Sequence, residues 1–382
     1  MVLAETVYFE ESMKSLKFAA LLLAAAPALA PLYAQTTVTK APFGTLPDGG
    51  KVDVYTLTDK TLNVRIITFG AHIVSVDAPD KSGNIADVVL GYNDLAGYLA
   101  DNKTYLGSVV GRYGNRIGKG QFTLDGKKVQ LDLNNNGNTL HGGTTGFDRL
   151  NWTGKQVPNG VELTLVSKSG DMGFPGTVTA HVTYQLQGDK IAVNYSATTD
   201  APTVVNLTQH SYFNLAGKGD ILGHILTLNA DRFTPTDAGL IPTGVLAPVA
   251  GTPFDFSKPT AIGARIDTPN EQLKLAGGYD HNWILTTPHP MGIKPIAVLT
   301  DPGSGRTLKV FTSEPGVQFY SGNFLDGTFK GRDGAPYTKY AGLCLETQHY
   351  PDSPNHPDWP STTLLPGHTY HSETVFQFTT TK

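Results

Sequence analysis

The sequence predicts an all-β fold, specifically a large antiparallel β-sandwich, from three observations. Short segments that alternate apolar and polar residues recur along most of the chain, which is typical of strands whose two faces meet different surroundings. The 42 glycines and 25 prolines can supply the many turns that such a fold needs. Helical periodicity is weak, and only residues 93–99 favour a short helix. We therefore expect residues 35–382 to form one domain of this class.

The predicted strands follow one another from residue 51 onward. The first three, at 52–57, 62–67 and 72–76, are separated by short turn segments. Further strands are predicted at 161–167, 178–186, 191–197, 222–228, 283–286, 296–299, 307–312, 317–320 and 374–379.

Turns and loops connect these strands in two ways. The segment Asp301-Pro-Gly-Ser-Gly305 predicts a tight hairpin between two of them. Residues 133–149 and 350–366 form longer loops. Long ordered loops on a β scaffold commonly carry binding residues, so we expect both to take part in a site.

The first 34 residues are predicted to be a signal peptide. Two lysines precede the apolar run 18–27, and small residues follow it. The run is too short to span a bilayer, and cleavage after Ala34 avoids a proline at the start of the mature chain. Acidic residues before Met13 do not belong in such a signal, so residues 1–12 are predicted to be a spurious leader. An exported bacterial protein, periplasmic or extracellular, is expected.

Net charge and cysteine content indicate which partners and which cellular compartment to expect. Removing the predicted signal takes away two of the 29 basic and three of the 33 acidic residues, which leaves a net charge of −3. This balance gives no electrostatic reason to expect a nucleic acid or an anionic membrane as partner. Cys344 is the single cysteine, so the chain forms no intramolecular disulfide, which suits a bacterial periplasm.

The segment 206–217 is the first candidate for a functional site. Asn206, Thr208 and His210 alternate with apolar residues, which predicts a half-buried strand whose polar face points away from the core. Tyr212 follows closely, and an aromatic ring beside amide and imidazole groups is suited to binding a sugar. Taken alone, however, this segment favours a structural histidine bonded to a backbone carbonyl.

Two glycine-containing segments supply further candidates. In 111–117, Asn115 and Arg116 offer several fixed hydrogen-bond donors for hydroxyl oxygens. In 134–143, His141 is followed by two glycines that allow a ligand to approach closely. Each segment could equally be a surface turn.

Two acidic residues complete the set of candidates. Asp280 precedes a predicted strand, where it could cap the loop or accept hydrogen bonds from two sugar hydroxyls. Glu346 shares one strand face with Cys344 and Gln348 and has apolar neighbours that would raise its pKa and make it a better base. The four other glutamates after residue 34 are expected at the surface or in loops: Glu162 and Glu373 facing solvent, Glu271 in a polar loop, and Glu314 before Pro315.

The sequence lacks the motifs that several other kinds of site require. The chain contains no phosphate loop, dinucleotide fingerprint or serine nucleophile elbow. His368 and His371 are three residues apart, which places them on opposite faces of a strand, and His281 has no second and third ligand that can be read nearby. No metal or organic cofactor is expected.

Six motifs together resemble the aldose 1-epimerase family, also called galactose mutarotase. They occur in the order found in that family and extend from about Pro42 to the C-terminus. The resemblance implies a galactose mutarotase-like supersandwich. The motifs are Gly111-Arg-x-x-Asn-Arg-Ile117, Leu140-His-Gly-Gly143, Asn206-Leu-Thr-x-His-Ser-Tyr-Phe-Asn-Leu-Ala-Gly217, Tyr279-Asp-His-Asn282, Gly316-Val-Gln-Phe-Tyr-x-Gly-Asn323 and Leu345-Glu-Thr-Gln-x-x-Pro-Asp352.

The same resemblance implies an isomerase that interconverts the α and β anomers of free aldohexoses such as glucose and galactose. By this resemblance Glu346 matches the catalytic base and His210 the catalytic acid. Gly114 and Gln209 depart from the family pattern without removing a group that the reaction needs. The substrate-binding positions implied are Asn115, Arg116, His141, Tyr212, Asp280 and Gln318.

Two other functions stay open from the sequence. A carbohydrate-binding β-sandwich without catalysis would keep the hydroxyl-binding groups and the aromatic residues. A glycoside hydrolase would need two carboxylates, for which Asp280 could join Glu346. In each case the expected partner is a small sugar, and the protein is expected to be a monomer or a weak dimer.

Overall fold

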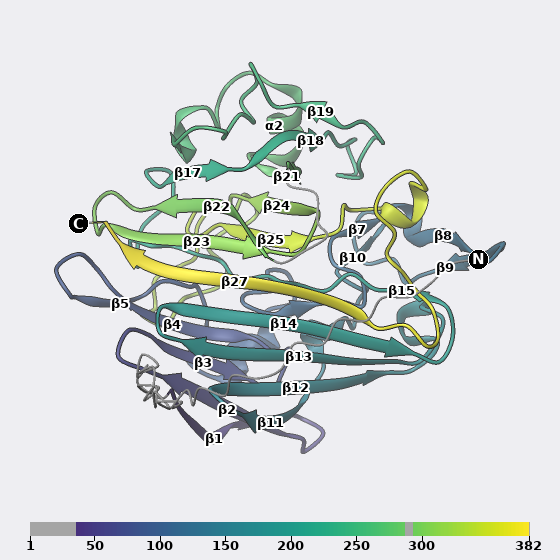
Figure 1. Ribbon diagram of the computed structural model, residues 1–382, viewed down its shortest axis with the longest axis horizontal. Coiled ribbons are helices and arrows are strands. Elements are labelled where there is room, and N and C mark those ends of the chain that lie inside the picture. The colour runs from purple at the N-terminus through teal and green to yellow at the C-terminus, as the bar shows by residue number, and fades with distance from the viewer. Residues whose placement is uncertain (1–35, 287–292, 382) are drawn as a thin grey trace, which may run out of the picture. The chain divides into compact units, whose positions relative to one another are not determined.

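The computed structural model describes residues 36–286 and 293–381 (Figure 1). The predicted signal peptide and leader lie outside the described residues. Among the described residues, no helix is long and apolar enough to cross a membrane.

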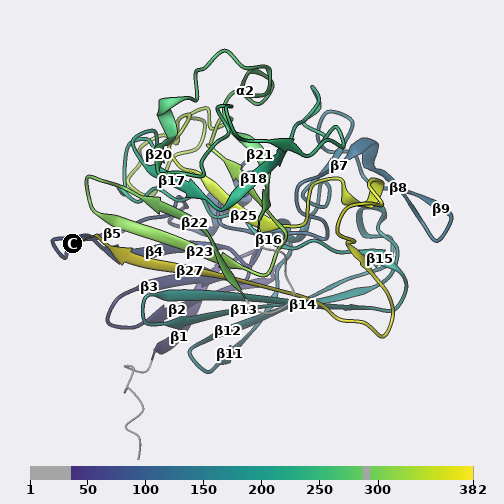
Figure 2. The ribbon, with the colours of Figure 1, turned by 45° about the horizontal axis from the view of Figure 1, so that its top comes forward.

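A nine-stranded antiparallel sheet forms one layer of the fold. Its long central strands run side by side in Figures 1 and 2. In order across the sheet, the strands are β11 (Thr153–Val157), β12 (Gly160–Ser167), β13 (Val178–Gln187), β14 (Lys190–Thr199), β27 (Tyr370–Thr380), β23 (Arg306–Thr312), β22 (Lys294–Thr300), β17 (Ile225–Leu228) and β20 (Thr260–Ala261).

Two five-stranded antiparallel sheets pack against this layer. The first contains β1 (Thr37–Thr45), β2 (Lys51–Thr58), β3 (Asn63–Ile67), β4 (Ile73–Pro79) and β5 (Ile85–Asp87) in sequence order. The second has the order β19 (Ala247–Pro248), β18 (Ala230–Thr234), β21 (Asp280–Leu285), β24 (Gly316–Tyr320) and β25 (Cys344–Gln348).

Short elements fill the connections. The two-stranded pairs are β6 (Val109–Val110) with β16 (Thr208–Gln209), β7 (Arg116–Ile117) with β10 (Thr139–Leu140), β8 (Gln121–Leu124) with β9 (Lys127–Gln130), and β15 (Thr203–Val204) with β26 (Thr363–Leu364). The α-helices are α1 (Leu95–Ala100) and α2 (Glu271–Ala276). Single 3-10 turns are Gly118–Gly120, Phe147–Arg149, Asp171–Gly173, Ile262–Ala264 and Ser353–Asn355.

One apolar cluster joins the layers. Every second residue of β13 is buried, and its inward residues pack in one core with those of β2 and β3. Leu57 of β2, Ile66 of β3 and Val182 of β13 are all fully buried there. Burying each such side chain contributes about 1.5–3 kcal/mol, so the alternation that predicts the strands also supplies the core.

The predicted all-β sandwich is confirmed. All twelve predicted strands overlap observed strands, and the hairpin at 301–305 joins β22 to β23, which pair antiparallel. The predicted helix at 93–99 corresponds to α1, which Asp94 caps by accepting a hydrogen bond from the Gly97 amide at 3.0 Å. The segment 222–228 becomes strand only over its last four residues, in β17.

Three local predictions need correction. Glu271 does not lie in a loop but in the first turn of α2, which the Asn270 side chain caps. The strand expected around His210 is the two-residue β16, and its surroundings are buried on both faces rather than one. Of the pair His368 and His371, only the second lies in a strand, β27.

The buried segment before His210 is held by Asn206. Its Oδ1 accepts the His349 amide at 3.0 Å, and its Nδ2 donates to the His349 carbonyl at 3.3 Å. Asn206 also forms a parallel bridge with Tyr113. The Asn206 side chain, predicted to lie on an open face, therefore satisfies neighbouring backbone, which sets the path of the chain toward His210.

Candidate active site

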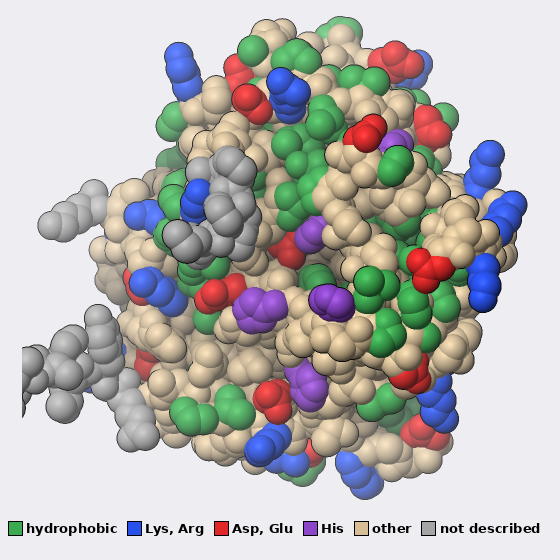
Figure 3. Space-filling view, turned by 45° about the vertical axis from the view of Figure 1, so that its right-hand side comes forward, with side chains coloured by type: hydrophobic (Ala, Val, Ile, Leu, Met, Phe, Trp, Pro, Cys, Tyr) green, Lys and Arg blue, Asp and Glu red, His purple; other side chains and the backbone are tan. Residues whose placement is uncertain are grey.

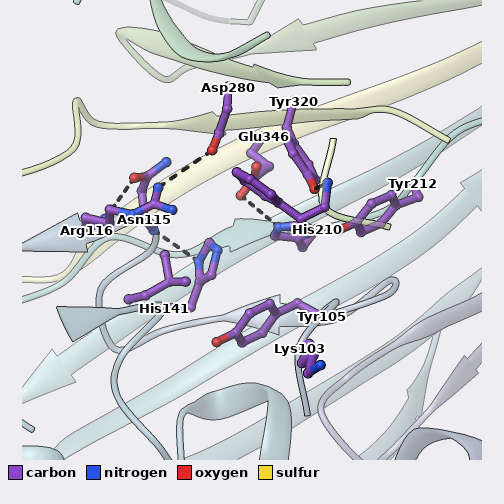
Figure 4. Close-up of a pocket in the computed structure, with 12 residues that line it drawn as sticks. Lys103, Tyr105, Asn115, Arg116, His141, His210, Tyr212, Asp280, Tyr320 and Glu346 are labelled. Atoms are coloured by element: carbon purple, nitrogen blue, oxygen red, sulfur yellow. Dashed lines mark hydrogen bonds and ion pairs between the residues drawn. The ribbon is translucent and has the colours of Figure 1, made fainter. Parts of the chain in front are cut away.

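Glu346, in the edge strand β25 of the second five-stranded sheet, and His210 line one pocket (Figure 4). The His210 Nε2 lies 3.7 Å from the Glu346 Oε2, and both side chains are buried. The position of Glu346 is fixed by the register between β25 and β24, in which Glu346 pairs with Gln318. The backbone of His210 is fixed on both sides, since its amide donates to the Ser108 carbonyl and its carbonyl accepts the Gly107 amide.

Burial disfavours the charged form of both members of this pair. It raises the pKa of Glu346 well above its usual range, with the Asp280 carboxylate adding to the rise and Arg116 opposing it. Burial lowers the pKa of His210 to about 4. At 3.7 Å, attraction between opposite charges offsets part of this cost. Burial thus shifts the balance from the ion pair toward the neutral pair, whereas the mutual attraction of the two charges favours the ion pair.

His141 and Asn115 hold each other at one wall of the pocket. The Asn115 amide donates to the His141 Nδ1 at 3.1 Å, and the His141 amide donates to the Asn115 carbonyl at 2.9 Å. Both residues have left-handed backbone, with φ of 59° and 51°. Burial, with His210 and Arg116, lowers the pKa of His141 well below 6.5. The neutral ring therefore accepts at Nδ1 and carries its proton on Nε2, which leaves Nε2–H as a donor for a ligand.

A glycine allows this wall to approach the segment that carries Asn115. Gly142 has φ of +90°, and a Cβ on it would lie 2.0 Å from the Gly111 carbonyl oxygen. Any other residue would push the His141 loop away from residues 111–117. The glycines after His141 were predicted to let a ligand approach, but Gly142 instead allows a close approach to the backbone of Gly111.

Arg116 and Asp280 form the second polar wall. The Arg116 Nη1 lies 3.8 Å from the Asp280 Oδ2, and its Nε donates to the Asn135 Oδ1 at 3.3 Å. Gln318 lies behind them and donates from Nε2 to the Asp280 Oδ1 at 2.7 Å. Burial raises the pKa of Asp280, whereas Arg116 and Gln318 lower it. The carboxylate is thus oriented from behind while one edge faces the pocket.

The two arginines of the 111–117 segment lie in different surroundings, because Arg116 lines the pocket and Arg112 does not. Arg112 is buried and points away from the pocket, where its guanidinium donates to carbonyls including those of Pro175, Gly176 and Lys168. Burial lowers the pKa of Arg112 to about 10. The reading of this segment as a surface turn with solvated arginines is therefore wrong, because both arginines are buried.

Aromatic residues line the remaining sides of the pocket. The Tyr212 ring lies 5.2 Å from the His210 ring, and Tyr105 lies 4.6 Å from the His141 ring. Phe324 is 57% exposed at the mouth and stacks on Tyr320, whose hydroxyl accepts the Phe324 amide. The face drawn in Figure 3 is hollowed near its centre, and its lysine and arginine side chains are scattered toward the edges.

His141, His210 and Glu346 also raise the question of a metal ion. One nitrogen or oxygen atom from each lies within 4.8 Å of the others. A histidine ligand must offer a bare nitrogen, but the Asn115 amide already occupies the lone pair of the His141 Nδ1. The proton of neutral His141 therefore sits on the nitrogen that would have to bind the ion, so this set fits hydrogen bonding to a ligand better than metal binding.

Most of the predicted site residues meet in this one pocket. Its wall includes Asn115, Arg116, His141, His210, Tyr212, Asp280 and Glu346. Gln318 is brought to the site but lies behind Asp280 instead of on the wall. Sequence reasoning missed Lys103, Tyr105, Leu140, Tyr320 and Phe324, which also line it.

Of the two loops predicted to take part in a site, one lines the pocket and the other supports a neighbouring strand. Loop 133–149 supplies His141, but loop 350–366 contributes no residue to the pocket wall. Its Asp352 instead donates its amide to the Arg116 carbonyl and accepts the Gly118 amide, which supports β7. His281 points away from the pocket and packs against Phe254.

Burial alone does not single out Glu346. Glu314 is also buried, and its Oε2 lies 2.6 Å from the Nδ1 of His349. What distinguishes Glu346 is an Oε2 that is buried in the pocket and has no hydrogen-bond partner among the described residues. A site of this kind, with a carboxyl and an imidazole facing each other among hydroxyl-binding groups, defines an acid–base enzyme for a small polyhydroxylated substrate.

Comparison with known proteins identifies the family. The family described as aldose 1-epimerase matches residues 53–377. Galactose mutarotase of Rattus norvegicus is 47% identical over 345 residues, covering 90% of this chain and 98% of that protein. Aldose 1-epimerase of Escherichia coli K12 is 40% identical over 338 residues, covering 87% and 96%. The chain belongs to the aldose 1-epimerase family.

A solved structure agrees with this assignment. The galactose 1-epimerase of Lactobacillus acidophilus superposes with a TM-score of 0.79 at 28% identity, covering 91% of this chain and all of that one. The resemblance inferred from six motifs is therefore confirmed, and with it the mutarotase-like fold.

Proposed function

We propose that this protein is an aldose 1-epimerase that interconverts the anomers of a free aldohexose, with Glu346 as base and His210 as acid. The observation that carries the proposal is the approach of the Glu346 Oε2 and the His210 Nε2 to 3.7 Å inside a pocket. Relatives named galactose mutarotase and aldose 1-epimerase, at 40–47% identity, support the same reaction.

Ring opening uses one proton transfer at each end of the hemiacetal. Glu346 takes the proton from the anomeric hydroxyl while His210 gives its Nε2 proton to the ring oxygen. The bond between the anomeric carbon and the ring oxygen breaks, and the open aldehyde forms. After rotation about the C1–C2 bond, the two transfers run in reverse and close the ring as the other anomer. Each positioned group should contribute about 10²–10⁴-fold to the rate.

The other pocket residues would hold the sugar during this exchange. His141 offers Nε2–H, and Arg116 offers guanidinium donors, to the ring oxygen and neighbouring hydroxyls. Asp280 accepts hydrogen bonds from more distant hydroxyls. The Tyr212 ring and the exposed Phe324 can cover apolar faces of the sugar.

Two alternatives make different demands on the site. A binding module without catalysis has no need of a buried Glu–His pair, because burying each charge is costly. A glycoside hydrolase uses two carboxylates on either side of the bond. Asp280 is already engaged by Gln318 and faces Arg116, whereas the partner of Glu346 is His210. Both features favour the epimerase.

Optical rotation separates the three functions. Freshly dissolved α-D-glucose and α-D-galactose should mutarotate faster with catalytic amounts of protein than in buffer alone. The rate should rise in proportion to protein concentration, and a panel of glycosides should release no reducing sugar. An unchanged rate with both sugars would contradict the epimerase, and release from a glycoside would favour the hydrolase.

The rate should depend on pH in a bell shape. The pair must hold one proton to contain both an acid and a base. Uptake of a second proton removes the base, and because burial lowers the pKa of His210 to about 4, this limb should lie near pH 4. Loss of the last proton removes the acid, and the raised pKa of Glu346 moves that limb upward. Because the two groups interact, the apparent pKa of each limb belongs to the Glu346–His210 pair and not to one residue. The profile of kcat/KM after subtracting the buffer rate tests this, and an acidic limb above pH 6 would contradict it.

Gln318 should act through Asp280 rather than by touching the sugar. Replacing Gln318 by methionine removes the donor that holds the Asp280 Oδ1, and hydrogen bonds to charged groups are worth about 1.5–3 kcal/mol. We expect kcat/KM to fall roughly tenfold or more, mainly through KM. Steady-state kinetics with galactose measure the change. A Gln318→Glu variant, which sets two carboxyls against each other, should be worse, and wild-type KM values in both would exclude this role.

We also propose export, with residues 35–382 as the mature domain. The two lysines, the apolar run 18–27 and the small residues after it support a signal peptide. The slightly acidic charge gives no reason to expect a nucleic-acid partner, and we propose a monomer or weak dimer. Expressed in a bacterium from Met13, the protein should appear in the periplasm with Gln35 as its first residue by mass spectrometry. An intact N-terminus in the cytoplasm would contradict export.

A further inference from the structure

The buried thiol of Cys344 lies against the catalytic histidine. Its Sγ is 3.5 Å from the His210 Nδ1, although 134 residues separate the two in sequence. Cys344 is completely buried and His210 nearly so. Among residues 36–286 and 293–381, no other side chain forms a hydrogen bond with this nitrogen.

Strand β25 thereby places a side chain beside each ring nitrogen of His210. Alternation along the strand turns Cys344 and Glu346 to the same face. The Nδ1 of His210 meets the thiol, and Nε2 meets the carboxyl at 3.7 Å. The rings of Tyr212 and His141 lie 5.2 Å and 5.0 Å away and limit the tilt of the imidazole.

The proposed reaction requires a particular tautomer of His210. The imidazolium gives its Nε2 proton to the sugar and later takes it back, so Nδ1 must keep its proton throughout. A neutral ring with the proton on Nε2 instead could not accept a proton at that nitrogen. Whatever faces Nδ1 must therefore be a hydrogen-bond acceptor.

We propose, resting on the function above, that the Cys344 sulfur accepts the Nδ1–H of His210 and so keeps Nε2 as the nitrogen that exchanges protons with the sugar. Cys344 is then a positioning residue, because it touches the acid and not the substrate. Burial raises the pKa of the thiol well above its usual range, so the sulfur stays neutral at working pH.

A weak acceptor at Nδ1 also suits a histidine that must give up a proton. A carboxylate in this place would stabilise the imidazolium and make it a poorer acid. Sulfur holds the Nδ1 proton with little stabilisation of charge. The pKa of His210 is lowered mainly by burial, with its own backbone carbonyl and the Asp101 charge opposing. The other titratable groups that face the ring are Cys344 and Glu346 on β25, His141 after β10, and Tyr105 and Tyr212.

Kinetics of two substitutions test the role in turnover. Cys344→Ala should lower kcat about tenfold with KM within about twofold of wild type, because the ring loses its partner while the sugar contacts remain. Cys344→Ser should retain most of kcat but move the acidic limb to higher pH, because a hydroxyl oxygen is a stronger acceptor. Leu345→Val is the matched control, since it trims the next residue of β25 on the face toward the apolar core. Wild-type kcat and pH profile in both Cys344 variants would overturn the proposal.

Nitrogen NMR of the unliganded protein provides a readout independent of activity. In wild type, neutral His210 should carry its proton on Nδ1, and Cys344→Ser should preserve this tautomer and raise the pKa of His210. A neutral ring protonated on Nε2 in wild type would overturn the proposal, even if Cys344→Ala did not fold. If wild type failed to accelerate mutarotation while its Nδ1 stayed protonated, the proposed function would fail but the assignment of the thiol would stand.

Discussion

Replacing Glu346 by glutamine is expected to lower kcat about 10²–10⁴-fold while the protein stays folded. Glutamine has nearly the same shape but cannot take a proton from the anomeric hydroxyl. The Glu346 Oε2 has no hydrogen-bond partner among the described residues, so the substitution breaks no bond at that atom and removes a charge that burial disfavours. Mutarotation of α-D-galactose, followed by polarimetry, measures the loss.

The matched control is Glu162→Gln, which makes the same change on β12 outside the pocket. It should leave kcat unchanged. Circular dichroism and thermal unfolding should show Glu346→Gln as stable as wild type or more so. If folded Glu346→Gln turned over within threefold of wild type, Glu346 could not be the base.

Replacing His210 by asparagine should have a loss of similar size, mainly in kcat. Asparagine keeps a polar group in the buried site but cannot donate and retrieve a proton at the position of Nε2. Because base and acid act in one concerted exchange, the double variant Glu346→Gln/His210→Asn should be little worse than the poorer single variant. Comparing kcat of the two single variants and the double variant tests this coupling.

His371→Asn, at an exposed position near the start of β27, is the control for this substitution. It should behave as wild type. Fully multiplicative losses in the double variant would show that the two residues act independently, and near-normal turnover of His210→Asn would remove its role as acid.

The sequence predicted the layers of the fold well because strand alternation is a local signal that burial enforces. The residues of β13 that alternate in sequence are the ones that face the core. Segment 206–210 was harder, because all five of its residues are buried by segments that lie far away in sequence. Asn206 binds the main chain of His349, a partner that no local pattern reveals.

The site was predicted as a set of residues but not as a geometry. Motifs could name His210 and Glu346, yet their 3.7 Å approach depends on the pairing of strands far apart in sequence. The same reason explains why Gln318 lies behind Asp280 and why Cys344 meets the Nδ1 of His210. Tyr105 carried no sequence signal, since its position depends on a left-handed backbone with φ of 57°.

The most direct test of the account is to follow the anomers of one sugar by proton NMR. Pure α-D-galactose should approach its equilibrium mixture far faster with wild-type protein than in buffer, and the equilibrium ratio itself should be unchanged, as required of a catalyst. Equal amounts of the folded double variant Glu346→Gln/His210→Asn should leave the buffer rate unaltered. A double variant that still accelerated the exchange to nearly the wild-type rate would contradict the central claim that this Glu–His pair opens the ring.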